Sequence, residues 1–229
     1  MIDISRHKFV LVQILKDIYS DISIASLLGF KGGTAAHLFY DLPRFSVDLD
    51  FNLLDPKKKN ILLETIPSIL GRTGRIKQQR EKRFTLFFLL SYGEKERNIK
   101  VEISKRIFPD HYKVMSYLGI PMLVMTREDL FAHKLVALSD RKSPANRDYF
   151  DLWFFMQNHW DINKEIVELR TSLSLKEYLK KCERIVEAIN EKYILQGLGE
   201  VLDTKLKNWT RENLKKELLF LIRFYLENV

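Results

Sequence analysis

The chain has 229 residues, of which 46% are hydrophobic and 30% charged, and this balance favours a folded globular protein over a disordered one. The single cysteine, Cys182, excludes an internal disulfide and fits a cytoplasmic location. No apolar run approaches the ~18 residues of a membrane span, and we expect neither a secretory signal nor a membrane partner. The formal net charge of +8 favours a polyanionic partner, such as a nucleic acid or nucleotide phosphates.

The first half of the chain mixes helix and strand patterns. Residues 4–20 carry apolar side chains at helical spacing, and the apolar stretch 22–28 is either a strand or the end of that helical region. Gly32 and Gly33 indicate a tight turn that opens a helix. Residues 46–54 alternate between apolar and polar side chains, which is typical of a half-buried strand.

The remaining elements change from mixed to helical along the chain. We expect a helix over 57–70 and two strands over 82–91 and 98–104, followed by a loop that contains Pro109 and Pro121. The rest is predicted to be helical, with helices over 126–141 and 146–159 and two or three more after them, of which the last covers 211–228.

Asp48 and Asp50 are the most informative pair of residues. Their spacing on a strand directs both carboxylates to one face, at most ~7 Å apart. Two carboxylates this close repel each other, and a divalent cation removes that cost. Mg²⁺ prefers oxygen ligands and usually binds one or two carboxylates together with substrate phosphates. The alternative is an ordinary strand face that is acidic because it faces solvent.

The segment Lys31-Gly32-Gly33-Thr34 lies at the predicted turn into a helix. Glycines allow the backbone to approach a phosphate closely, and the first turn of a helix offers N–H donors and a partial positive charge. Taken alone, the segment is also compatible with an ordinary strand-to-helix turn. Because two carboxylates on a strand follow it, the sequence predicts a site for a metal-bound nucleoside triphosphate.

Four further residues are candidates for this site. Glu102 lies on the polar face of a strand that could pair beside Asp48 and Asp50, where it would bind metal, deprotonate an attacking hydroxyl, or simply face solvent. Lys134, among apolar neighbours on its helix, reaches either a phosphate or solvent. Asp148 lies near a helix start, which favours an acid. Asp151, beside a bulky apolar run, is expected to be partly buried and to need Lys134 or an arginine as partner.

Other chemistries find little support in the sequence. Cys182 has no nearby histidine, and the five histidines show no metal-ligand spacing, so neither a cysteine nucleophile nor a zinc site is predicted. The P-loop and dinucleotide-binding glycine patterns are absent from the sequence.

Three motifs resemble those of the AbiEii/AbiGii nucleotidyltransferase toxins, a family that also includes the MenT toxins. The first is FKGGTAAHLFYDLPRFSVDLDF over residues 30–51, which resembles the family's K-G-G-T-A-L and R-x-S-x-D-L-D-F block. The second is KLVALSDR over 134–141 and the third RDYFDL over 147–152. All three occur in the family's order, with one departure at His37, where the family usually has an aliphatic residue.

The resemblance implies an α+β fold with a DNA polymerase beta-like nucleotidyltransferase core, formed by a small mixed sheet with flanking helices. It implies a core lobe over residues 1–117 and a mainly helical lobe over 118–229 that completes the active site. The implied activity is Mg²⁺-dependent transfer of a nucleotide from an NTP to an RNA acceptor, in related toxins the 3′ end of tRNA. A cognate antitoxin protein is the implied partner.

We assign candidate roles on this basis. Asp48 and Asp50, with Glu102 as a third carboxylate, are expected to bind the metal. Lys134 is expected to neutralise charge on the triphosphate, and Asp151 or Asp148 to orient it or to assist the acceptor hydroxyl. The candidate nucleotide-binding residues are Lys31, Gly32, Gly33, Thr34, Ser46, Arg44, Arg141 and Arg147. Two alternatives remain: a non-catalytic module that binds nucleic acid or a partner on a degenerate fold, and a nucleotidyltransferase that modifies small molecules.

Overall fold

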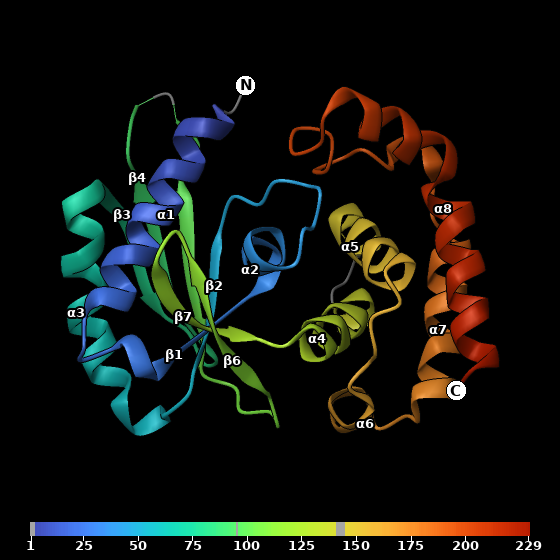
Figure 1. Ribbon diagram of the computed structural model, residues 1–229, viewed down its shortest axis with the longest axis horizontal. Coiled ribbons are helices and arrows are strands. Elements are labelled where there is room, and N and C mark those ends of the chain that lie inside the picture. The colour runs from blue at the N-terminus through green and yellow to red at the C-terminus, as the bar shows by residue number, and fades with distance from the viewer. Residues whose placement is uncertain (1–2, 95, 141–144) are drawn as a thin grey trace. The chain divides into compact units, whose positions relative to one another are not determined.

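The computed structural model describes residues 3–94, 96–140 and 145–229, which form two compact units (Figure 1). The first unit contains the residues up to Asp41 and Phe45–Met125, and the second contains Leu42–Arg44 and Thr126–Val229. Among the described residues, no helix combines the length and apolarity needed to cross a membrane.

The first unit is built on a mixed sheet with the strand order β3-β4-β5-β2-β1-β7-β6. The strands are β1 Leu28–Lys31, β2 Leu49–Leu53, β3 Arg75–Glu81, β4 Thr85–Ser91, β5 Ile99–Ser104, β6 Tyr112–Tyr117 and β7 Ile120–Met125. The central strand β2 runs antiparallel to β1 and parallel to β5. The helices of this unit are α1 Ile4–Ser20, α2 Gly32–Phe39 and α3 Lys59–Thr73, with short 3-10 turns at Ala25–Leu27 and Pro56–Lys58.

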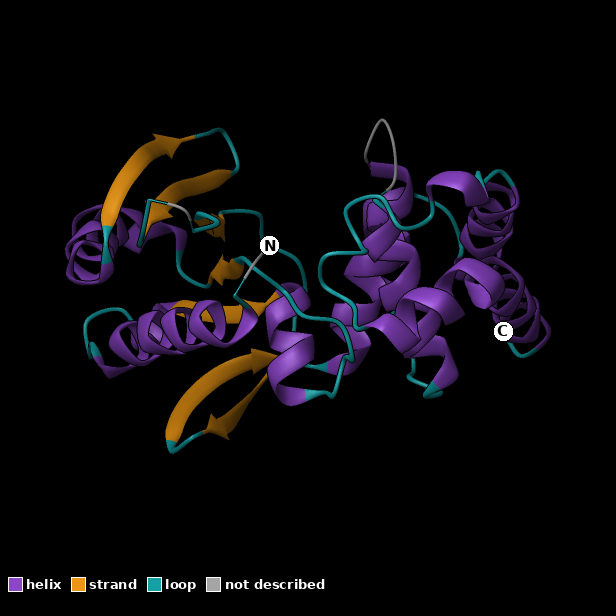
Figure 2. Ribbon diagram, turned by 90° about the horizontal axis from the view of Figure 1, so that it is seen from above, coloured by secondary structure: helices purple, strands orange, loops and turns teal. Residues whose placement is uncertain are grey.

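The apolar face of the sheet explains the alternation in the sequence. Leu49 and Phe51 of β2 are fully buried, and Phe51 packs against Tyr19 of α1 with the ring centroids 6.4 Å apart. The helices α1 and α3 pack against each other, and they contact β7 and the β3–β4 hairpin respectively. Figure 2 shows the β3–β4 and β6–β7 hairpins at opposite ends of the twisted sheet. The opposite face of β2 is therefore left for its polar side chains.

Three strands, β3, β6 and β7, were not expected from the sequence. The segment β3 was not expected, because its residues RIKQQRE are almost all exposed on the edge of the sheet and show no apolar alternation. The predicted loop around Pro121 instead forms the β6–β7 hairpin, whose turn places both Leu118 and Gly119 at positive φ. Those φ values match the turns that two-residue hairpin loops favour, although leucine gives little sequence signal for one. The predicted lobe boundary, between residues 117 and 118, falls inside this hairpin, whose two strands pair with each other.

The second unit is helical, as expected. Its helices are α4 Arg127–Asp140, α5 Asn146–Gln157, α6 Lys164–Thr171, α7 Leu175–Glu187 and α8 Thr204–Glu227, with a 3-10 turn at Glu191–Tyr193. The last helix begins seven residues before the predicted start at 211, because Asp203 caps it by accepting a hydrogen bond from the Leu206 N–H at 2.8 Å. The Trp209 ring, in this extra part of the helix, lies with its centroid 4.1 Å from that of Trp153.

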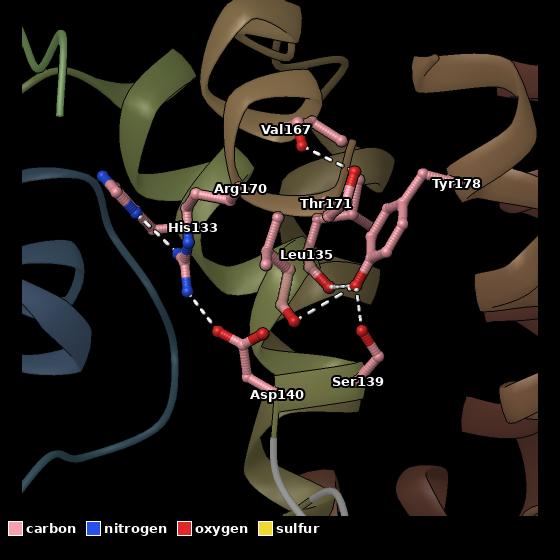
Figure 3. Close-up of polar contacts among 9 residues, drawn as sticks. His133, Leu135, Ser139, Asp140, Val167, Arg170, Thr171 and Tyr178 are labelled. Carbon is pink, nitrogen blue, oxygen red and sulfur yellow. Dashed lines mark hydrogen bonds and ion pairs between the residues drawn. The ribbon is translucent and has the colours of Figure 1, made fainter. Parts of the chain in front are cut away.

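Polar contacts hold α4 against its neighbours (Figure 3). The Tyr178 hydroxyl of α7 lies 2.9 Å from Ser139 Oγ and 3.1 Å from the Val136 carbonyl oxygen of α4. Arg170 of α6 forms an ion pair with Asp140 and a 2.8 Å hydrogen bond with His133. These contacts fix the helix that carries Lys134.

Candidate active site

The predicted site residues fall into two groups, one in each unit. In the first unit, Asp50 lies within β2 and Asp48 immediately precedes it, so the strand is three residues shorter at this end than the predicted 46–54. Both aspartates are half-buried, whereas Val47, Leu49 and Phe51 between and beside them are buried. The alternation therefore places the two carboxylates on the polar face, as the sequence predicts.

Asp48 is held by the neighbouring strand. Its Oδ1 accepts a hydrogen bond of 3.3 Å from the backbone N–H of Lys100, and its Oδ2 lies 3.6 Å from the Lys100 ammonium. Its own carbonyl oxygen accepts a hydrogen bond from the Thr34 hydroxyl of α2. The carboxylate is 15% exposed, so it stays reachable while its backbone is fixed.

The start of α2 lies against Asp50. Lys31 pairs with Asp50 in the β1–β2 ladder, and the next residue, Gly32, has φ +80 and begins the helix. A methyl group at Gly32 would lie 2.9 Å from Asp50 Cβ and closer still to Oδ2. Glycine is required here both by the left-handed backbone and by this close approach. Lys31, at the N-cap, has no acceptor with which to cap the first N–H groups of α2.

Glu102 lies beside Asp50 on the next strand, which confirms the predicted pairing. The two residues are partners in the parallel β2–β5 ladder, so their side chains share the polar face. Within the described ranges, no three His, Cys, Asp or Glu side chains are arranged to hold a metal ion by themselves. Oxygen donors from Asp48 and Asp50 fit Mg²⁺, which usually completes its shell with phosphate oxygens and water. The metal role of Glu102 stays a prediction.

His7 supports Asp48 from the apolar side, a role that the sequence analysis did not assign. The buried ring contacts the Val47 carbonyl oxygen through Nε2 at 3.0 Å and the Tyr92 hydroxyl through Nδ1 at 2.7 Å. Burial lowers the pKa of His7 below its ordinary value. A neutral ring therefore donates from Nε2 to Val47 and accepts from Tyr92. The available signal was that His7 lies on the same helical stripe as Leu11 and Ile14.

The second unit gathers Lys134, Asp148, Asp151 and Arg44. The Lys134 ammonium lies 3.0 Å from Asp148 Oδ1 and 2.9 Å from Asp151 Oδ2. Arg44 is 3% exposed and binds both oxygens of Asp151, through Nη2 at 2.7 Å and through Nε. Asp151 is fully buried and not only partly so as expected, and the expectation that it needs Lys134 or an arginine as partner is confirmed, since it has both.

The charges in this network stabilise one another. Burial alone would raise the pKa of Asp151, but the Arg44 and Lys134 cations outweigh it and hold that pKa below its usual value. Burial would likewise lower the pKa of Lys134, yet the two carboxylates together raise it. Asp148 and Asp151 are both fully buried, so removing one cation would leave a buried charge without compensation.

The remaining predicted residues are less informative. Gly33 and Thr34 are buried in the first turns of α2, Ser46 is half-buried, and Arg147 is half-buried in the first turn of α5. Arg141 lies outside the described residues. The proposed contacts of these residues and of Arg44 with a nucleotide stay predictions.

The fold resembles two solved structures from Helicobacter pylori. One is a candidate nucleotidyltransferase, 22% identical with a TM-score of 0.65, which covers 97% of this chain and 94% of that one. The other, JHP933, is 23% identical with a TM-score of 0.65, and the match covers 98% of this chain and 92% of that one. At these identities the likeness concerns the fold, and it supports the predicted α+β nucleotidyltransferase core with a helical C-terminal part.

The family follows from the sequence match. The family described as "Nucleotidyl transferase AbiEii toxin, Type IV TA system" matches residues 13–219, and the chain belongs to this family. An uncharacterized protein from Aquifex aeolicus (strain VF5) is 30% identical over 141 residues, which are 60% of this chain. The match spans only 62% of that relative's length. The resemblance noted in the sequence motifs is therefore confirmed at the level of the family.

Proposed function

We propose that this chain is a Mg²⁺-dependent nucleotidyltransferase that transfers a nucleotide from an NTP to an RNA acceptor, with the 3′ end of tRNA as the acceptor. The observation that carries the proposal is the close approach of Gly32 to Asp50 beside Asp48. This arrangement puts a pair of carboxylates next to the positively polarised start of a helix. A metal-bound triphosphate needs both features in one place.

The reaction forms one phosphorus–oxygen bond and breaks another. An RNA hydroxyl attacks the α-phosphorus of the NTP, and the bond to the β-phosphate breaks to release pyrophosphate. Asp48 and Asp50 would hold Mg²⁺, which supplies positive charge to the phosphate oxygens when bound. The backbone of Lys31–Thr34 and Ser46 would bind phosphate oxygens. Glu102 would accept the proton of the attacking hydroxyl.

Lys134 keeps its proposed role as a cation for the triphosphate. Its two carboxylate partners hold the ammonium in a fixed position, which fits a charge that must be placed before the reaction. Asp151 also binds Arg44, so Asp151→Asn disturbs the contacts of both cations. Testing both Asp148→Asn and Asp151→Asn separates their contributions.

The biological setting is part of the proposal. Membership of a toxin family described as type IV supports a toxin whose activity a cognate antitoxin counteracts. The buried single thiol of Cys182 and the lack of a disulfide fit a reducing cytoplasm.

The test is a transfer assay. The purified chain is incubated with Mg²⁺, total tRNA and each of the four NTPs labelled at the α-phosphate, and we expect label in RNA from at least one NTP. Asp50→Asn should abolish transfer, whereas Asp17→Asn, on α1 at the opposite, apolar face of the sheet, should not. Failure to label any RNA, under conditions where a related enzyme is active, would refute the acceptor assignment. NTP-independent RNA binding would then favour the non-catalytic module, and label in a small molecule would favour the third alternative.

A further inference from the structure

The strand register connects the carboxylates to the edge of the sheet. Asp50 pairs with Glu102, Glu102 with Phe87, and Phe87 with Arg80, in one row across β2, β5, β4 and β3. Paired residues direct their side chains to the same face, so Arg80 lies on the face that carries Asp50. With neighbouring strands ~4.8 Å apart, three steps place the β3 backbone roughly 14 Å from Asp50.

A group of cations and one aromatic ring lies near the end of β3, in the turn from β3 into β4 and just after β5. We call it the basic rim, and it consists of Arg80, Lys82, Arg83, Phe84 and Arg106. The Lys82 ammonium lies 4.5 Å from the centroid of the Phe87 ring, in the same row as Glu102. The guanidinium carbons of Arg83 and Arg106 lie 4.8 and 4.6 Å from the centroid of Phe84, which is 41% exposed.

Stacking prepares these guanidinium groups to bind phosphate. A guanidinium above an aromatic ring uses its flat face, so the N–H donors on its edge remain available for oxygen acceptors. In the part of the chain that the structure describes, no carboxylate forms an ion pair with the four cations of the rim. Nearby Glu81 is bound by Lys59 and Lys105 instead, at 2.8 Å each. The rim thus keeps its positive charge.

Protection of the sheet edge does not account for the whole group. Charged residues on an edge strand discourage pairing with other chains, and this would explain Arg80 alone. An exposed phenylalanine works against that purpose, because it adds apolar surface. Phe84 is better explained as the platform that holds Arg83 and Arg106 side by side.

The site also defines the direction from which an acceptor approaches. The start of α2 lies on the β1 side of Asp50, and Glu102 lies on the β5 side. In phosphoryl-type transfer the attacking and leaving oxygens are roughly in line, so the acceptor arrives opposite the pyrophosphate. If the triphosphate binds at α2, an acceptor that comes over β5 and β4 passes Lys82, which lies above Phe87, and reaches Arg80 on β3.

We propose that the basic rim is the docking surface of the RNA acceptor, whose phosphates bind the Arg83 and Arg106 guanidiniums while its 3′ end extends toward Glu102. The inference rests on the proposed function, since it assumes that an RNA is the acceptor. The net charge of +8 complements a polyanion of this kind.

Direct RNA binding tests the rim without requiring catalysis. The affinity of the full chain for deacylated total tRNA is measured by fluorescence anisotropy at several salt concentrations, with no NTP present. The double variant Arg83→Gln/Arg106→Gln should bind tenfold or more weakly, with a salt slope smaller by about 1.4–1.8 if two phosphate contacts are lost. Phe84→Leu should weaken binding as well, because it removes the platform of both guanidiniums.

Matched controls separate docking from general charge. Lys180→Gln/Arg184→Gln removes two exposed cations from α7, and Phe220→Leu removes an exposed ring from α8. Both controls should keep the wild-type affinity and salt slope. In the transfer assay, the rim variants should raise the KM for RNA and leave the KM for NTP unchanged. Thermal unfolding shows whether each variant is folded. If Phe84→Leu is not folded, the double variant Arg83→Gln/Arg106→Gln alone tests the docking proposal.

The outcomes are distinguishable from failure of the proposed function. Wild-type tRNA affinity and salt slope in the rim variants would overturn the docking proposal, even if the wild-type chain transfers nucleotides. Absence of transfer, with rim-dependent RNA binding intact, would refute the enzyme and leave the RNA surface. Loss of binding to an acidic partner protein, with RNA binding unchanged, would assign the rim to a protein and also overturn the proposal.

Discussion

Replacing Gly32 by alanine tests the junction between α2 and β2. Its φ of +80 costs an alanine about 1–2 kcal/mol, because the left-handed region brings Cβ too close to the following carbonyl oxygen. The new methyl group would also lie 2.9 Å from Asp50 Cβ. Carbon atoms that are not bonded prefer ~3.5–4.0 Å, so one of the two must move by roughly 0.6–1.1 Å.

The expected result is a modest loss of stability and a large loss of activity. A loss of 1–2 kcal/mol lowers the Tm of a chain of this size by about 2–8 °C. A displacement of Asp50, a proposed metal ligand, by about 1 Å can reduce the rate about 100-fold. The measurements are thermal unfolding and label transfer from NTP to RNA.

Gly119→Ala is the matched control for this change. Gly119 has φ +79, but a methyl group there would meet no heavy atom within 4 Å. The control should lose only the ~1–2 kcal/mol that the left-handed backbone costs, and it should keep its activity. Equal activity in the two variants would refute the reasoning, because the contact with Asp50 would then have no effect on the reaction.

Three further predictions concern buried titratable groups. The pKa of Asp151 is lowered in the folded state, so the ionised carboxylate stabilises the fold fully above the unfolded pKa near 4, and this stabilisation is lost as the pH falls through the folded pKa. Asp151→Asn should therefore lower the free energy of unfolding by about 3–5 kcal/mol at pH 7 and by less at pH 3, as measured by denaturant unfolding. The pKa of His7 is also lowered, so the stability of the fold should be highest above pH ~6.5 and should fall as the pH drops below it. The urea midpoint, measured between pH 5 and 8, should change less steeply with pH in His7→Gln than in the wild type. An unchanged slope would contradict the neutral ring. Burial raises the pKa of Cys182 to about 12, so a thiol reagent should label it only after unfolding, and rapid labelling of the native chain would contradict its burial.

Local patterns predicted the polar face of the strand that carries Asp50 well. The two-residue period of residues 47–53 reflects one buried and one polar face, so the shared face of Asp48 and Asp50 could be inferred directly. The need of Asp151 for a cation was also predictable, because a buried carboxylate is costly without a partner. Both inferences depend on local sequence and elementary electrostatics.

Contacts between distant residues were harder to predict. Arg44 and Asp151 are separated by 107 positions, and the first sequence motif suggested only a nucleotide contact for the arginine. His7 had the apolar neighbours that indicate burial, but its partner Val47 lies 40 positions away. The edge strand β3 carries no apolar alternation because neither face of it is well covered. The part of the proposed docking surface that β3 carries therefore became visible only through the strand register.

The assignment of Leu42–Arg44 to the helical unit has a practical consequence for expressing parts of this protein. A fragment that ends at Met125 would include Arg44 and lack Asp151, and a fragment that begins at Thr126 would hold Asp151 without that arginine. Leu42 is 1% exposed and would lose its apolar surroundings in the same way. No single cut of the chain yields both units complete, so we expect the two units to be made as one chain and to lose their activity together when either is damaged.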